Sequence, residues 1–119
     1  MGWWDRVRGR SADDAEVTVV LDVEQRRAQL LRLEQALDRL ARQMRQVQSV
    51  DNPGWRERIN EYSRLAGDAT VARQGVPTRE GLLDLVFEVR PVFTGPPPPG
   101  LESLVPLQDA LLAAAEELR

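Results

Sequence analysis

The sequence predicts a mainly α-helical fold, an antiparallel helical hairpin with a C-terminal helix packed across it. Apolar residues recur at alternating spacings of three and four over 30–47, 55–69 and 104–118, the period of one helix face. Only a short connection, SVDNPGW, separates the first two stretches, so their helices are expected to fold back on each other. A length of 119 residues with 42% hydrophobic and 29% charged residues suits one globular domain.

The strongest periodic signal lies in the first stretch and predicts a long helix from about Glu24 to Val50. Good helix formers fill this range, and neither Gly nor Pro interrupts it. The apolar seam has the a and d spacing of a heptad, and its members are Leu30, Leu33, Leu37, Leu40, Met44 and Val47.

A second helix is predicted to begin at the break that follows. Asp51 or Asn52 can cap it, and Pro53 suits a first helical turn, where the missing N–H group has no partner to lose. Gly67 weakens this helix by about 1 kcal/mol relative to alanine, and its end is expected near residues 75–77. Its apolar stripe consists of Trp55, Ile59, Tyr62, Ala66 and Ala69.

Two segments fit either a helix or a strand. VTVVLDV at 17–23 is rich in β-branched residues and alternates like a strand, whereas SADDAE before it resembles a helix start at Ser11. Residues 82–90 are equally ambiguous, although Thr78 could cap a helix there and Pro91 could end it. A lone strand would leave its backbone unpaired, so both segments should have the same structure. Helices are favoured, and the alternative is an α+β fold with short strands at 17–23 and 82–90.

The remaining chain is a proline-rich segment and a last helix. TGPPPPG is expected to be a stiff polyproline II spacer, and the helix after it has a third seam of the same spacing. The organisation within one domain is an N-terminal Trp/Arg segment, a hairpin body, a spacer and a C-terminal helix, at 1–10, 11–93, 94–100 and 101–119.

Composition excludes most catalytic chemistry. The chain has no cysteine and no histidine, which removes thiol nucleophiles, imidazole bases and the usual zinc ligands. All sixteen basic residues are arginine, so a phosphate-binding loop that ends in lysine cannot occur. The adjacent carboxylates Asp13 and Asp14, like Glu116 and Glu117, would diverge by about 100° on a helix. We therefore expect no enzyme, no cofactor and no metal site.

The opening MGWWDRVRGR contains the first candidate contact site. Trp3 and Trp4 are side chains typical of a membrane–water interface, and Arg6, Arg8 and Arg10 could reach anionic headgroups. The same residues could instead bind a protein partner, or the tryptophans could pack as a lid on the helical body. Gly2 and Gly9 argue against a stable helix here.

A second candidate site is the basic face of helix 24–50, with Arg32, Arg39, Arg42 and Arg45 as a polyanion-binding face. Against nucleic acid stand the net charge of −3 and the lack of interleaved aromatic residues. A solvated face partly paired with acidic segments explains these arginines as well.

The favoured function is a non-catalytic interaction or adaptor protein in the cytoplasm that acts at a membrane surface through its N-terminus. The alternative is a small nucleic-acid-binding regulator that uses the arginine face of helix 24–50. Three thin apolar seams give a small core, so we expect a homodimer in which two hairpins form a four-helix bundle. The sequence has no apolar run long enough to span a membrane and no secretory signal, which supports the cytoplasmic expectation.

Overall fold

The structure, a computed structural model, describes residues 2–47 and 53–119, with side chains described from residue 22 onward. Within these residues it is all helical, without strands. The elements in chain order are α1 (Gly2–Gln46), α2 (Pro53–Gln74), α3 (Arg79–Glu88), the short 3₁₀ helix η1 (Glu102–Leu104) and α4 (Val105–Glu117).

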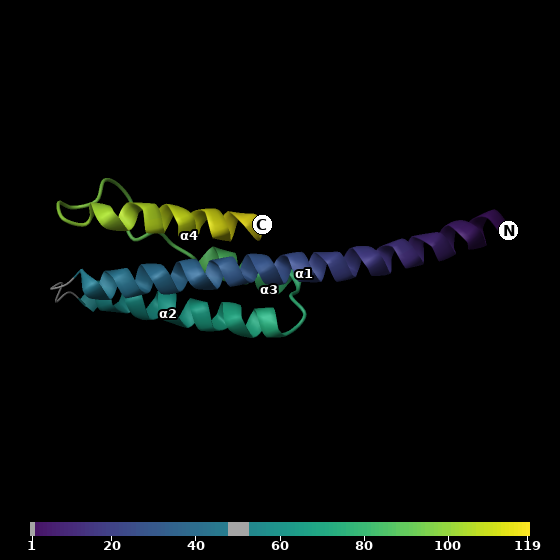
Figure 1. The fold of residues 1–119 in the computed structure, drawn as a ribbon, viewed down its shortest axis with the longest axis horizontal. Helices are drawn as coiled ribbons and strands as arrows, with labels where there is room; N and C mark the ends of the chain where they lie inside the picture. The colour runs from purple at the N-terminus through teal and green to yellow at the C-terminus, as the bar shows by residue number, and fades with distance from the viewer. Residues whose placement is uncertain (1, 48–52) are drawn as a thin grey trace.

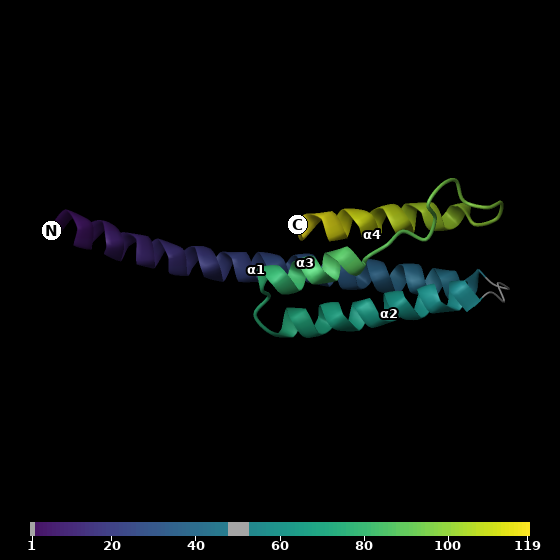
Figure 2. The ribbon, with the colours of Figure 1, turned by 180° about the vertical axis from the view of Figure 1, so that it is seen from behind.

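The C-terminal half of α1 is the centre of the molecule. The helix α2 packs along one side of it as an antiparallel hairpin, α4 lies along the other side, and α3 packs against α2 (Figure 1 and Figure 2). The N-terminal half of α1 continues past all of these helices and gives the molecule its long shape, 71 × 24 × 17 Å.

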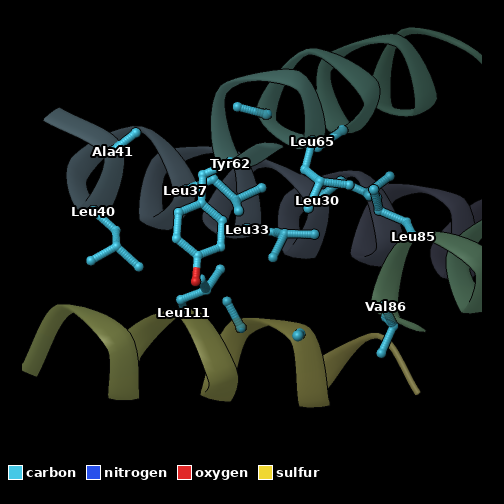
Figure 3. Close-up of a cluster of buried hydrophobic side chains, with 14 of the residues drawn as sticks. Leu30, Leu33, Leu37, Leu40, Ala41, Tyr62, Leu65, Leu85, Val86 and Leu111 are labelled. Atoms are coloured by element: carbon cyan, nitrogen blue, oxygen red, sulfur yellow. The ribbon is translucent and has the colours of Figure 1, made fainter. Parts of the chain in front are cut away.

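The seam of α1 forms the core, as its spacing predicts. Leu33 and Leu37 are fully buried among side chains of α2, α3 and α4, including Tyr62 and Leu111 (Figure 3). Burying one leucine side chain contributes roughly 1.5–3 kcal/mol. Fully or almost fully buried α1 residues are Leu30, Leu33, Leu37, Leu40, Ala41 and Met44.

Polar contacts fix how α2 lies on α1. The indole Nε1 of Trp55 donates to the carbonyl oxygen of Met44 at 3.1 Å. Near the other end of α2, Arg73 Nη2 lies 3.1 Å from Glu34 Oε2, and the Thr70 hydroxyl donates to the same carboxylate. The Glu34 side chain is only 15% exposed, so these donors compensate for the lost hydration of its charge.

The helical interpretation of 82–90 is correct, and the strand alternative is wrong. Thr78 caps α3 by accepting a hydrogen bond from the Gly81 backbone N–H at 3.1 Å. The helix ends at Glu88, before Pro91, because a proline disfavours helical geometry in the residue that precedes it. The segment after α3 is held by Tyr62, whose hydroxyl donates to the Arg90 carbonyl.

The proline-rich segment is a corner rather than a straight spacer. The Phe93 N–H donates to Gln108 Oε1 at 2.8 Å, which ties the start of the loop to α4. At its far end, Leu101 N–H donates to the Pro98 carbonyl, and Gly100 has φ of 92°, a conformation that favours glycine. The chain thereby turns back, and α4 can return along α1.

The first helix is longer than the predicted 24–50. It begins at Gly2, so Ser11 lies inside it and is not its start, and the strand alternative at 17–23 is wrong. At the other end α1 stops at Gln46, and the expected capping residues Asp51 and Asn52 lie outside the described residues. The second helix begins at Pro53 and ends at Gln74, as predicted.

Candidate interaction surfaces

The N-terminal candidate site lies at the free end of α1. The backbone of Trp3, Trp4, Arg6, Arg8 and Arg10 is helical, despite Gly2 and Gly9, and their side chains lie outside the described part. At about 1.5 Å per residue, Gly2 is about 35 Å along the helix from Arg26, the region where the body begins. The tip therefore projects away from the bundle and does not form a lid on it (Figure 1).

Two arginines hold α1 where it enters the body. Arg27 donates through Nε and Nη2 to the Gly75 carbonyl, at 3.2 and 2.9 Å, just after α2 ends. Arg26 donates to the Glu117 carbonyl at the end of α4, at 3.3 Å, and to Gln29 Oε1 at 3.0 Å. Carbonyl groups at helix C-termini lack helical partners and favour cations. The sequence does not indicate this role, because it depends on where α2 and α4 end.

The four arginines of the proposed polyanion face do not act as one array. Arg32 donates to Glu117 Oε2 from Nε and Nη2, at 2.9 and 2.7 Å, and this ion pair joins α1 to α4. Arg45 donates to the Ser63 hydroxyl of α2 at 2.7 Å. These two lie on opposite flanks of α1, about 140° apart around the helix. Arg39 and Arg42 are exposed between them, so the face offers fewer free cations than the sequence indicates.

A groove of about 410 Å³ lies between α1 and α4. Its lining is mostly small and apolar, from Ala36, Leu107, Ala110, Ala113 and Ala114, with Arg32, Gln35, Arg39 and Glu117 at the edges. Two of these edge residues, Arg32 and Glu117, form an ion pair with each other.

Two further observations concern the titratable groups of the body. Burial raises the pKa of Tyr62 to about 12, an effect that nearby Arg58 opposes, so this phenol stays protonated near neutral pH. Among the side chains from residue 22 onward, outside the gap at 48–52, no three acidic groups converge as metal ligands would.

These features define a class, an all-helical hairpin bundle from which one helix projects. Searches with the chain find no matching family model, no matching curated protein and no matching solved structure. Within the described residues, no helix combines the length and apolar character that crossing a membrane requires.

Proposed function

We propose that this protein is a non-catalytic adaptor whose helical body holds α1 while the free end of α1 contacts an anionic membrane surface. The observation that carries the proposal is the length of α1. It has 45 residues, but α2, α3 and α4 lie only along its C-terminal half (Figure 2). A helix that continues so far beyond its own domain exposes its end to another molecule.

The distribution of charge along α1 favours membrane contact through its first ten residues and not through the residues that follow. Residues 1–10 contain three arginines and one aspartate, whereas residues 11–23 contain Asp13, Asp14, Glu16 and Asp22 and no basic residue. An anionic surface would attract the first segment and repel the second. The tip would therefore meet the membrane with the rest of α1 held away from it, and the body would face the cytoplasm.

The proposal assigns no catalytic role to the chain. The chain offers no cysteine or histidine, the groove between α1 and α4 has alanine walls, and Tyr62 is used to hold the loop after α3. Binding through a short tip gains little apolar burial, so we expect reversible membrane contact.

Vesicle flotation tests the proposal. We expect the protein to float with vesicles that contain anionic phosphatidylserine, to stay behind with pure phosphatidylcholine, and to lose flotation at high salt. The Trp3→Ala, Trp4→Ala double variant should lose binding without a change in melting temperature. A matched control is Phe87→Ala, which removes an aromatic side chain that is 67% exposed on the body. Equal flotation of the double variant and the wild type would contradict the proposal.

A further inference from the structure

We propose that two copies of this chain associate through antiparallel pairing of residues 2–22 of α1. The paired face includes Trp3 and Arg10, which also belong to the tip proposed to contact a membrane, so association is measured in the absence of lipid. It rests on the helical backbone of α1, on the sequence pattern along it, and on where the body begins.

One stripe runs along the projecting half of α1. Its residues are spaced by 4, 3, 4, 3 and 4, so they share a single helix face: Trp3, Val7, Arg10, Asp14, Val17 and Leu21. The same face continues onto the body at Ala28 and Leu31, which are exposed, Leu31 by 37%. On the described part of α1, this face is therefore not the one that Leu30 and Leu33 occupy in the core.

The stripe is complementary to itself when reversed. In an antiparallel pair with its two-fold axis at residue 12, Trp3 lies opposite Leu21, Val7 opposite Val17, and Arg10 opposite Asp14. This register places apolar side chains opposite apolar ones at both ends and Arg10 opposite Asp14 in the centre. A charged residue in such a seam costs stability but specifies the register. A parallel pair would instead place Arg10 against Arg10 and Asp14 against Asp14, which is repulsive.

The available length fits this register. Among the described side chains, Arg26 and Arg27 contact the ends of α4 and α2, and Asp22 lines a hollow together with Arg79 and Leu118 of the body. We therefore take residue 22 as the limit of the paired region. Twenty residues of helix give an interface about 30 Å long. The expected dimer therefore differs from one in which two hairpins form a four-helix bundle, because the bodies lie at opposite ends.

Trp4 and Arg8 do not belong to the stripe. They lie about 100° and 140° from its centre around the helix, and both remain on the outside of the pair. A membrane could still attract these side chains, so association and lipid binding can be measured separately.

Charge exchange within the central layer tests the pairing. Sedimentation equilibrium without lipid, over micromolar concentrations, should give a dimer for the wild type. Arg10→Glu places two acidic residues in each central contact, and Asp14→Arg places two basic ones, so each variant should dissociate at least tenfold more readily. Mixing the two variants in equal amounts restores opposite charges in both contacts and should restore the dimer, as should the Arg10→Glu, Asp14→Arg double variant.

Arg8→Glu is the matched control, because it makes the same charge change on the far side of the helix and should leave the dissociation constant within about twofold. Circular dichroism of each variant checks that α1 is still helical. A monomeric wild type would overturn the inference. So would a dimer that Arg10→Glu leaves unchanged, which would indicate pairing through the bundle or a parallel pair, and so would a mixture that stays monomeric.

Discussion

Tyr62 joins three parts of the fold through one side chain. It is fully buried beside Leu33 and Leu37 of α1, it belongs to α2, and its hydroxyl donates to the Arg90 carbonyl in the segment after α3. Burial raises its pKa because the phenolate would lose hydration, and the neutral phenol keeps its hydrogen bond. Its role is therefore to hold the return of the chain towards α4.

The titration of this phenol is directly observable, because Tyr62 is the only tyrosine. We expect phenolate absorbance to appear with a midpoint near pH 12 in the native protein and about pH 10 in denaturant. The unfolded chain loses this proton first, so the free energy of unfolding is unaffected below pH 10 and falls as pH rises from 10 to 12. Tyr62→Phe should show neither the absorbance change nor this decline. A native midpoint at pH 10 would contradict the buried placement.

The sequence indicated which arginines of α1 are exposed, but it did not indicate their partners. Helical spacing predicted correctly that Arg32, Arg39 and Arg42 avoid the apolar seam and face outwards. Spacing along α1 could not indicate that Glu117, 85 residues later, would pair with Arg32. That contact depends on the corner at 94–100, which sets where α4 lies against α1.

The sequence predicted helical structure clearly for the C-terminal half of α1 and only ambiguously for its N-terminal half. A leucine seam specifies the helix at 30–47, because the period of 3.6 residues is unambiguous over many turns. Residues 17–23 carry β-branched side chains, whose helix propensity is lower by only a few tenths of a kcal/mol each. A helix already nucleated further along the chain extends at little cost, so continuity outweighs that local preference.

The helix α3 was predictable from its cap, but the face it buries was not. Thr78 marks the start of α3, and Pro91 lies three residues after its end at Glu88. Leu82, Leu85 and Val86 are buried and Leu83 is only half-buried, and α3 packs against α2. Both Leu83 and Leu85 are apolar, so composition alone did not distinguish them.

Gly67 gives a prediction for α2. It lies in an exposed helical position, and a Cβ added there would meet no atom within 4 Å. Gly67→Ala should therefore raise the free energy of unfolding by about 1 kcal/mol, because alanine loses less backbone entropy in a helix. Urea denaturation measures this. As a control, Ala69→Gly in the buried face of the same helix should be destabilising. A loss of stability in Gly67→Ala would mean that α2 does not have this helical backbone.

For the whole molecule, the association proposed above determines a measurable length. One copy extends 71 Å, and two copies that overlap along about 30 Å of α1 should measure about 110 Å. Small-angle X-ray scattering at a concentration that gives dimers should return this maximum dimension. Arg10→Glu should return a value close to that of one copy, and a compact dimer no longer than one copy would contradict the antiparallel arrangement.

The hydrogen bonds of Arg26 and Arg27 to the ends of α4 and α2 also have a mechanical consequence. Because α1 is one continuous helix from the buried seam to its tip, a rotation of α1 about these contacts moves the tip as well. A tilt of roughly 10° within the bundle would displace the tip by about 6 Å over a 35 Å arm. A molecule that binds in the groove between α1 and α4 and tilts α1 would therefore displace the tip of α1 further than it displaces the groove.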